Sequence, residues 1–469
     1  MATSEDDVRT KGASQVLGDF SSSFQYCELD PKDQERVKIR LLNVVACVLA
    51  GKRHIASELG ARYVRAVAGL GVSSFWLGKD KGSVEDCAFV NSMMAHAVLL
   101  DDTVTHTGTM LVPTALAVAE AEGSSGADVL SALALGYELA ARIESGHGLS
   151  GAVTRQEFRH SWPAVFGAVA AAARLMGCSG EGIGDALSLM TTLSVPGVMA
   201  KNANLPNDME RDRIGESWTA ERYLQLAANA RNAVLTARLA RMGFHGMSVA
   251  LEGECGLYGV YTGRAGLPPE LFYRLGTDWH FSEIGVKPYP GSWVVPVYCA
   301  ETLLKQGDFT FEDIEGIVVR MVTWRRYIAV ISPGPFVSQE QALMSCPFSI
   351  AACLVYGKYD TEVLAKAVGD ERVNGLARIV ECVGLPGSQG PGGRVGELEI
   401  TLKDGRVLMA NASEMPLDYV LPDSWEAMLA RLYRVVPGLE QERGAQIAQT
   451  VWNLDTAASV NELIDTLLR

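Results

Sequence analysis

Apolar residues recur every three or four positions through most of the first half of the chain, and this spacing predicts a series of helices. Asp30 followed by Pro31 predicts the start of a long helix, because aspartate caps helices and proline fits the first turn. Ser125 with Asp128 three residues later predicts a capping box. The predicted helices cover residues 31–51, 57–68, 84–100, 113–122, 128–144, 163–176, 181–192 and 220–242. More than half of the chain is thus predicted to form one all-α domain.

Beyond about residue 281 the pattern changes to that of strands mixed with helices. Residues 316–324 are rich in β-branched side chains, which predicts a strand. Residues 398–402 and 407–409 alternate apolar and polar positions on either side of Asp404-Gly405, a sequence typical of a hairpin turn. These segments predict a separate α+β domain.

Helices are predicted again near residues 339–356 and 360–367, and from residue 422 to the end. The glycine-rich segment 384–396 is not followed by a helix, so it is predicted to be a flexible loop and not a phosphate-binding loop. The predicted fold is mainly α with an α+β part. It is divided into a first helical part over residues 1–282, an α+β domain over 283–414 and a helical return over 415–469.

Composition and charge narrow the class of protein. With 48% hydrophobic and 20% charged residues, the 469-residue chain resembles a soluble globular enzyme and not a disordered protein. The net charge of −14 argues against binding to nucleic acid or to an anionic membrane. We see no secretory signal and no run long enough to span a bilayer. Nine scattered cysteines without a CxxC pair predict free thiols in a reducing compartment, so we expect a cytoplasmic protein.

Polar and titratable side chains are concentrated in residues 91–120, between two apolar flanks. In order, the segment contains His96, Asp101, Asp102, Thr103 and His106. Buried polar groups are costly unless they are hydrogen-bonded or used in function, so the segment is a candidate site. A helix that ends at Asp101-Asp102, a polar loop and a new helix after Pro113 would give the same pattern without catalysis. The segment alone supports both interpretations equally.

Several stretches of the chain, taken in order, match one known family pattern. They are residues 41–51, 91–120, 126–143, 165–177, 230–243, 251–257, 287–296 and 345–354. The most specific parts are the segment from His96 to Thr103 and the Lys-Pro-Tyr-Pro motif that begins at Lys287. From about residue 25 to its end the chain resembles the MmgE/PrpD family. Members of this family include 2-methylcitrate dehydratase, cis-aconitate decarboxylase and an iminodisuccinate epimerase.

The resemblance implies a large helical domain closed by a smaller α+β lid, with the active site between them. It also implies a homodimer and no metal or organic cofactor. The expected partner is a small di- or tricarboxylate substrate, on which the chemistry proceeds by proton removal or donation beside a carboxylate.

The resemblance also implies catalytic residues. His106 is the candidate acid–base group, since imidazole titrates near neutral pH. Lys287 would pair with a substrate carboxylate or stabilise an enolate-like intermediate, and Tyr327 would donate a proton from the lid. His160 matches a family histidine, although alignment without gaps places Phe158 there. A loop histidine and a solvated lysine are the non-catalytic interpretations of His106 and Lys287.

The expected substrate-binding residues are Thr103, Arg222, Asp101, Asp102 and Ser292. Arg222 aligns with a family lysine and keeps its charge, but an arginine cannot readily act as a base. The two aspartates would orient the loop or cap a helix and would not react. Leu99 stands where the family has aspartate, and Ser292-Trp293 stand where a histidine is usual. A less polar pocket predicts a substrate with fewer carboxylates or a different outcome of proton transfer.

The sequence therefore predicts a cofactor-independent lyase that dehydrates or decarboxylates a small carboxylic acid. An isomerase or epimerase would use the same proton abstraction without a leaving group, and a non-catalytic binding protein on the same fold is a further alternative. A metal-dependent hydrolase built on Asp101, Asp102 and His106 has the least support. No second carboxylate–histidine set with the spacing of metal ligands is present in the sequence.

Overall fold

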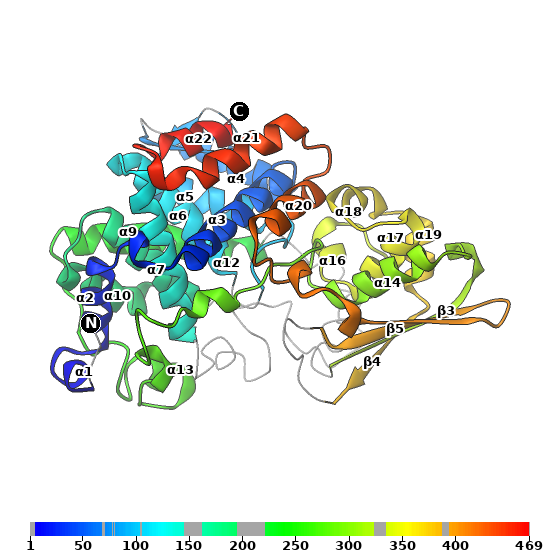
Figure 1. The fold of residues 1–469 in the computed structure, drawn as a ribbon, viewed down its shortest axis with the longest axis horizontal. Helices are drawn as coiled ribbons and strands as arrows, with labels where there is room; N and C mark the ends of the chain where they lie inside the picture. Colours follow the sequence, from blue (N-terminus) through cyan, green and yellow to red (C-terminus); the bar gives the residue numbers. More distant parts are fainter. Residues whose placement is uncertain are drawn as a thin grey trace.

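The structure is a computed structural model that describes residues 5–67, 71–76, 78, 80–103, 106–144, 162–194, 221–322, 334–386 and 394–468. Figure 1 shows two bodies side by side, a larger one made of helices and a smaller one that carries a sheet. Both ends of the chain lie in the larger body. The predicted fold class, mainly α with a large helical domain and a smaller α+β domain, is confirmed.

The larger body is built around helices that are buried on nearly every side. In α6 (Thr107–Glu122) every residue as far as Ala119 is buried, as expected for a central helix that is apolar all round. The glycines of α7 (Gly126–Glu144) and α9 (Val165–Leu175) let these helices touch, because a Cβ on Gly167 would lie 1.9 Å from Gly136 O. This body also contains α1 (Glu5–Lys11), α2 (Ala13–Ser23), α3 (Pro31–Gly51), α4 (Ile55–Val67), β1 (Ser73–Ser74), β2 (Lys81–Gly82), α5 (Val84–His96), α10 (Gly180–Leu193), α12 (Glu221–Arg241) and α13 (Leu257–Thr262).

Helix starts that the sequence predicts from capping residues are confirmed. Pro31 is the first residue of α3, and Asp30 accepts a hydrogen bond from the Asp33 N–H at 2.8 Å. At α7, the Asp128 N–H donates to Ser125 Oγ and the Ser125 N–H donates to Asp128 Oδ2, both at 3.2 Å. These local signals therefore place helix starts to within two residues.

Two predicted helix boundaries around the polar segment are wrong. Helix α5 ends at His96 and not at residue 100, since Leu99 adopts a left-handed backbone conformation with φ of 51°. Helix α6 begins at Thr107, and Pro113 lies inside it. A proline cannot donate to the carbonyl four residues before it. Pro113 is nevertheless buried within the helix.

The C-terminal helices pack on the larger body. They are α20 (Trp425–Val435), α21 (Gln441–Trp452) and α22 (Asn461–Leu468). Met428 and Leu463 belong to its hydrophobic core, and α20 packs on α3. A second core is formed by residues between Tyr289 and Ala412, together with Leu99. The two cores agree with the division at residues 282 and 414, whose positions stay a prediction.

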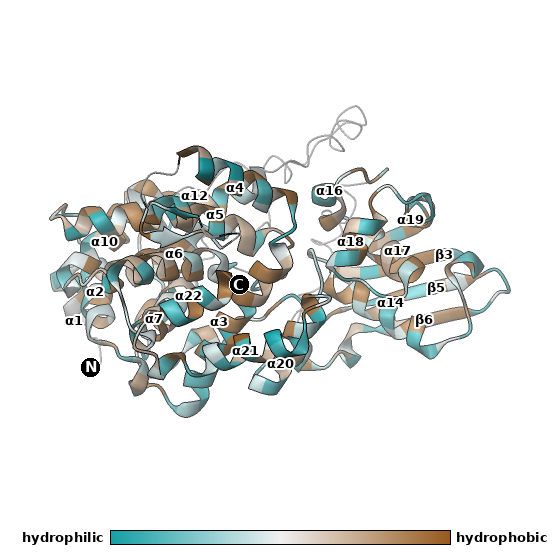
Figure 2. Cartoon of the chain, turned by 90° about the horizontal axis from the view of Figure 1, so that it is seen from above, coloured by the Kyte–Doolittle hydropathy of each residue, from teal (hydrophilic) through white to brown (hydrophobic). Residues whose placement is uncertain are grey.

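The smaller body, the lid, has a four-stranded sheet with helices over one face (Figure 1). In the order β4-β3-β5-β6, β3 (Ile314–Val322) is parallel to β4 (Val380–Leu385), and β5 (Gly396–Leu402) is antiparallel to β3 and to β6 (Val407–Asn411). Helix α14 (Val294–Gln306) packs on β5 and β6. The crossover from β3 to β4 contains α16 (Gln339–Leu343), α17 (Cys346–Tyr356), α18 (Thr361–Ala367) and α19 (Glu371–Ala377). Figure 2 shows α16 and α20 at the junction of the two bodies.

The predicted hairpin is confirmed, with β5 and β6 paired around Asp404-Gly405 and Gly405 at a φ of 88° that suits glycine. The strand predicted at residues 316–324 is described as far as Val322. Strand β4 lies outside the predicted strands, and its residues do not alternate regularly between buried and exposed. The glycine-rich loop lies partly outside the described residues, since 387–393 are not among them.

The helix predicted near residues 339–356 is two helices. The first ends at Leu343, and Ser345 caps the second by accepting a hydrogen bond from the Phe348 N–H at 3.2 Å. Pro347 follows in the first turn of α17, where a missing N–H costs nothing. The break turns α16 into a separate short helix at the domain junction.

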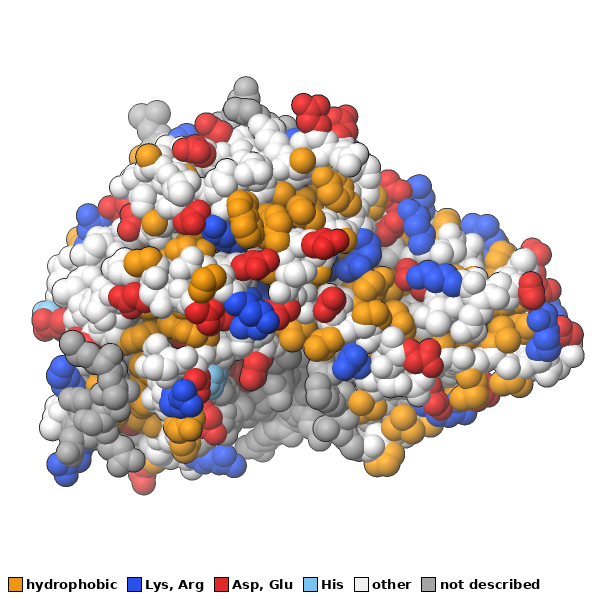
Figure 3. Space-filling model, in the orientation of Figure 1, with side chains coloured by type: hydrophobic (Ala, Val, Ile, Leu, Met, Phe, Trp, Pro, Cys, Tyr) orange, Lys and Arg blue, Asp and Glu red, His pale blue; other side chains and the backbone are white. Residues whose placement is uncertain are grey.

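Surface and thiol chemistry agree with the expectations from composition. All nine cysteines are free thiols. Within the described ranges, no helix combines the length and the apolar character that crossing a membrane requires. On the face drawn in Figure 3, acidic and basic side chains are interspersed among apolar ones.

Candidate active site

Two segments far apart in the sequence pair with each other at the junction of the two bodies. The Thr103 N–H donates to Gly285 O at 2.9 Å, the Lys287 N–H donates to Asp101 O at 3.1 Å, and one antiparallel bridge links the segments. A Cβ on Gly285 would lie 2.5 Å from the backbone oxygen of Val420 and 2.8 Å from Thr103 Oγ1, so this close approach favours glycine. The pairing brings the side chains of Asp101 and Lys287 together.

Asp101 is fully buried and binds three basic side chains. Its Oδ2 accepts hydrogen bonds from His96 Nδ1 at 2.8 Å and His106 Nδ1 at 2.7 Å, and its Oδ1 accepts from Lys287 Nζ at 2.5 Å. Burial alone would raise the pKa of Asp101, but the charges of His106, Lys287 and His96 outweigh it and hold this pKa well below the ordinary 3.8. Asp101 is therefore an ionised acceptor at the centre of the cluster.

The contact with Asp101 fixes the tautomer of His106. An ionised carboxylate only accepts hydrogen bonds, so His106 Nδ1 carries a hydrogen and Nε2 is the basic nitrogen of the neutral ring. Lys287 Nζ lies 3.1 Å from the same Nδ1. The His106 side chain is 22% exposed and that of His96 is 6% exposed. Of the two imidazoles, His106 is the one that a small molecule can reach.

The backbone of His106 is in an unusual conformation. His106 precedes α6 in the left-handed region, with φ of 50° and ψ of 29°, which few residues other than glycine adopt. The Thr109 N–H and Oγ1 donate to His106 O at 3.2 and 2.7 Å, and Asp101 holds its side chain. Strained residues held by their surroundings are common at functional sites.

Asp102 has a different role, because it caps α6 from outside the helix. Its Oδ2 accepts from the Gly108 N–H at 2.7 Å and the Tyr137 hydroxyl at 3.2 Å, and its Oδ1 accepts from Asn43 Nδ2 at 3.1 Å. His106 occupies the N-cap position but makes no side-chain cap, so Asp102 supplies it. Burial raises the pKa of Asp102. Asp102 thus fixes the loop that carries His106.

Arg431 of α20 donates hydrogen bonds to both active-site segments, the one before Asp101 and the one that carries Lys287. Its Nη1 donates to Lys287 O at 2.7 Å, its Nη2 to Leu100 O at 2.5 Å and its Nε to Asn43 Oδ1 at 2.9 Å. Burial lowers the pKa of Arg431 to about 10, so the group stays charged at neutral pH. Three distant parts of the chain therefore build one site.

Comparison with known proteins identifies the family. The family model described as MmgE/PrpD N-terminal domain matches residues 15–270, more than half of the chain. The chain belongs to the MmgE/PrpD family. One relative is the cis-aconitate decarboxylase-like protein oryM of Aspergillus oryzae, which is 26% identical over 93% of this chain and 94% of the relative. The family resemblance of the sequence is confirmed.

The structure of this MmgE/PrpD protein brings together several of the predicted site residues. His106, Lys287 and Asp101 meet at one point, and Thr103 lies two residues beyond Asp101 on the same segment. Ser292 lies five residues beyond Lys287 and is partly buried.

The other predicted residues are not tested by the structure. Tyr327 and His160 lie outside the described residues. Arg222 lies in the first turn of α12, but its side chain is not among those described. Their roles stay predictions.

Sequence reasoning missed the residues that support the cluster. Asn43, Tyr137 and Arg431 are each at most 1% exposed and hold Asp102, Lys287 or their segments. The available signal was a single polar residue in an apolar helical pattern, as in Leu42-Asn43-Val44. Such residues must be hydrogen-bonded when buried, and their partner cannot be read from the sequence.

Three residues of the cluster are of types that bind metal ions, namely His96, Asp101 and His106. One possible ligand atom from each lies within 4.8 Å of the others. The ammonium of Lys287, however, lies 2.5 Å from Asp101 Oδ1 and 3.1 Å from His106 Nδ1. A second cation at this position would be repelled at short range. These residues therefore fit an ion pair and not a metal ion.

Leu99, where the family pattern has aspartate, belongs to the lid core. Its side chain is 4% exposed and lies in the same apolar cluster as Tyr289 and Trp293. The left-handed conformation of Leu99 is one that aspartate adopts more readily than leucine. The backbone of this position thus agrees with the family pattern, while its side chain makes the junction more apolar.

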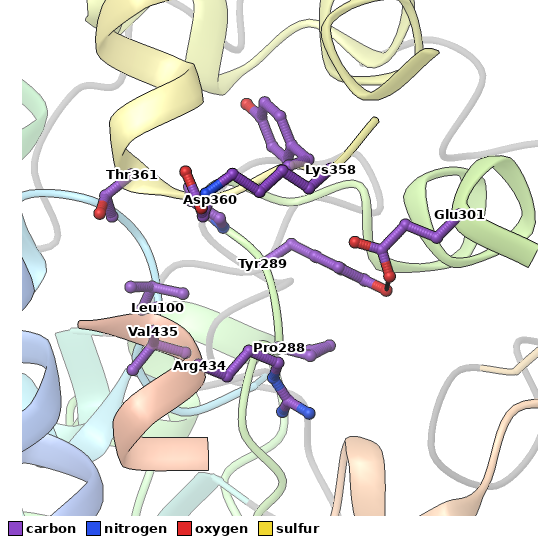
Figure 4. A pocket seen from close by; sticks show the side chains of 11 residues that line it. Leu100, Pro288, Tyr289, Glu301, Lys358, Asp360, Thr361, Arg434 and Val435 are labelled. Carbon is purple, nitrogen blue, oxygen red and sulfur yellow. Dashed lines mark hydrogen bonds and ion pairs between the residues drawn. The ribbon is translucent and has the colours of Figure 1, made fainter. Parts of the chain in front are cut away.

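A cavity of about 190 Å³ lies at the same junction (Figure 4). It is lined by Leu100, Pro288, Tyr289, Pro290, Glu301, Lys358, Tyr359, Asp360, Thr361, Arg434 and Val435. Lys358 pairs with Asp360 at 2.6 Å, and the Tyr289 hydroxyl donates to Glu301 at 2.8 Å. None of the predicted site residues whose side chains the structure describes lines this cavity, so we assign no ligand to it.

Proposed function

We propose that this MmgE/PrpD protein is a cofactor-independent lyase that dehydrates or decarboxylates a small carboxylic acid. The observation that carries the proposal is that the two oxygens of Asp101 hold His106 Nδ1 at 2.7 Å and Lys287 Nζ at 2.5 Å. This arrangement orients a neutral imidazole as a base and places an ammonium beside it.

In the proposed reaction, His106 Nε2 removes a proton from the carbon beside a substrate carboxylate. Lys287 Nζ would stabilise the negative charge of the resulting enolate. Two of its N–H groups go to Asp101 Oδ1 and Asp102 O, and a third is left for the substrate because His106 Nδ1 carries its own hydrogen. Departure of a β-hydroxyl as water, with a proton donated by Tyr327, would complete a dehydration. In a decarboxylation, His106 would instead start as the imidazolium, and its Nε2 proton would go to the carbon left by CO₂.

The family resemblance supplies the remaining roles as part of the proposal. Arg222, Thr103 and Ser292 would hold the substrate carboxylates, and Tyr327 and His160 would supply protons. The name of the relative, cis-aconitate decarboxylase-like protein, supports a lyase. We further propose a homodimer in the cytoplasm as the working form.

An isomerase or epimerase is the second candidate. Leu99 favours it, because the site has one carboxylate fewer than the family pattern and an epimerisation needs no group to assist departure. Both candidates share the same base and differ in what happens after proton removal.

The test is proton NMR in heavy water with purified protein and a panel of small acids that includes cis-aconitate, 2-methylcitrate, citrate and simpler hydroxy and amino diacids. Loss of a substrate signal with formation of an alkene would establish a lyase. Deuterium uptake beside a carboxylate without net loss would establish the epimerase. Silence across the panel would point to a more specialised substrate or to a non-catalytic binding protein.

A matched pair of histidine variants makes the assay specific. His106→Ala should abolish the reaction. His245→Ala is the control, because His245 Nδ1 also lies 2.8 Å from a buried aspartate, Asp185, but its side chain is 73% exposed and away from the cluster. Equal activity in both variants would contradict the assignment of His106.

A further inference from the structure

Glu340 brings a buried carboxylate from the lid to the surface of the helical body. It lies in α16, and its side chain is only 10% exposed. A carboxylate this buried requires hydrogen-bond donors. Glu340 has no role in the proposed chemistry, so its position calls for a different explanation.

The donors that face Glu340 come from the helical body. Glu340 Oε1 lies 3.5 Å from the Tyr223 hydroxyl and 3.9 Å from His54 Nε2. His54 Nδ1 accepts the Ala56 N–H at 3.2 Å, so in the neutral ring Nε2 carries the hydrogen and faces the carboxylate. Tyr223 is fully buried and His54 is 3% exposed. The contact thus joins the two bodies inside the protein.

Tyr223 connects this contact to the catalytic cluster. Its hydroxyl lies 3.4 Å from Ala97 O, one residue beyond α5. Its ring meets the His96 ring at 77° with centroids 6.3 Å apart, and the His96 ring meets that of His106 at 88° with centroids 4.7 Å apart. A continuous series of packed rings therefore leads from Glu340 to His106.

The other end of α16 contacts the segment that carries Lys287. A Cβ on Gly291 would lie 2.4 Å from Leu343 O, and Gly291 has a φ of 85°. The Gly291 N–H donates to Val98 O at 3.2 Å. The short helix α16 thus meets the Lys287 segment directly at Leu343, and Glu340 is linked to the end of α5 through Tyr223.

We propose that Glu340 is a positioning residue that holds the lid against the helical body and, through Tyr223, keeps His96 and His106 in place. The inference rests on the proposed function only in taking His106 as the acid–base group. Glu340 itself does not touch the reacting atoms.

The test compares Glu340→Ala, Glu340→Gln and Tyr223→Phe with the control Glu371→Gln, an exposed carboxylate on α19 of the same body. Amide hydrogen exchange is followed by mass spectrometry in peptides covering residues 93–103 and 339–343. A lost hydrogen bond to a charged group changes an opening equilibrium by about tenfold or more. We expect exchange of both peptides to be about tenfold faster in Glu340→Ala, less affected in Glu340→Gln and unchanged in Glu371→Gln.

The double variant Glu340→Gln/Tyr223→Phe should exchange no faster than the more affected single variant, because the two side chains act as a unit. Faster exchange confined to residues 339–343 would overturn the proposal, since Glu340 would then stabilise only its own helix. Glu340→Gln keeps the shape of the side chain and carries the test if Glu340→Ala does not fold.

Exchange needs no substrate, so this result is separate from the outcome of the lyase assay. Where turnover is detected, we expect kcat to fall in Glu340→Ala with a smaller change in KM and partial recovery in Glu340→Gln. Equal kcat in Glu340→Ala and the unaltered protein would also overturn the proposal.

Discussion

Asp101 and Lys287 are 186 positions apart in the chain, and their charged groups lie 2.5 Å apart. Both are largely buried, so each needs the other to offset the loss of water. The same carboxylate also orients His106. The ion pair therefore links the helical body, through Asp101, to the segment that leads into the lid, through Lys287. The same carboxylate binds the candidate base.

Replacing Asp101 by asparagine should remove both function and stability. The amide keeps the shape but leaves Lys287 without its counter-charge, and breaking a buried ion pair costs about 3–5 kcal/mol. The orientation of His106 is lost as well, so turnover should fall by about three orders of magnitude. Urea unfolding and the NMR assay measure the two effects. Asp185→Asn should cost less than Asp101→Asn, because its partner His245 is 73% exposed and keeps its contact with water. Similar costs in both variants would contradict the central role of Asp101.

Stability in acid should report the ionised state of Asp101. Its folded pKa is held well below the ordinary 3.8, so its contribution is present above pH 3.8 and is lost as the pH falls through the folded value. The free energy of unfolding should therefore decrease below about pH 4, and Asp101→Asn should flatten that decrease. A chemical denaturation series between pH 3 and 7 measures it. An Asp101→Asn curve parallel to that of the unaltered protein would contradict the depressed pKa.

The contribution of Asp102 to stability should depend on pH in the opposite direction to that of Asp101. Burial raises its folded pKa, so its contribution is largest in acid and declines as the pH rises through the folded value.

Much of the fold could be predicted because its signals are local. Asp30-Pro31 and Ser125 with Asp128 place helix starts from cap chemistry alone, and Asp404-Gly405 places the hairpin from turn chemistry. The sequence pattern changes from helical to mixed near residue 281, and most residues of the second core follow that point, although Leu99 also belongs to it.

The misplaced boundaries have a tertiary cause. Leu99 and His106 adopt left-handed conformations because the segment between them pairs with residues 285–287. That pairing has no local signal, so the sequence extends α5 to residue 100 and delays α6 to Pro113.

The candidate site was only partly predictable for the same reason. His106 and Lys287 were found from motifs, but the division of labour between Asp101 and Asp102 depends on partners that come from elsewhere. Nothing near Arg431 in the sequence indicates that it holds Lys287.

The cap that Asp102 provides should be separable from catalysis. Tyr137→Phe removes one hydrogen bond to Asp102 and should cost about 1 kcal/mol, while Asp102→Asn weakens the cap of α6 and should cost about 2 kcal/mol. Thermal unfolding measures both. Turnover should fall less in Tyr137→Phe than in Asp101→Asn, because the contact between His106 and Asp101 remains. A loss of turnover in Tyr137→Phe as large as that in Asp101→Asn would place Asp102 in the chemistry.

Leu99 and Ser292 should determine whether the site prefers substrates with fewer carboxylates. Leu99→Asp with Ser292→His restores the family pattern at both positions, and the left-handed backbone at residue 99 accepts aspartate. A charge in place of a side chain that is 4% exposed should cost about 2–4 kcal/mol, so folding is checked first by thermal unfolding.

The double variant should then gain activity toward citrate, 2-methylcitrate or cis-aconitate in the NMR assay. Leu99→Asn with Ser292→His is the matched control, because it has the same shape without the carboxylate and should gain less. If both double variants fold and neither turns over a tricarboxylate, the apolar character at residue 99 does not select the substrate. Selection of the substrate would then have to come from Arg222 or another of the predicted carboxylate-binding residues.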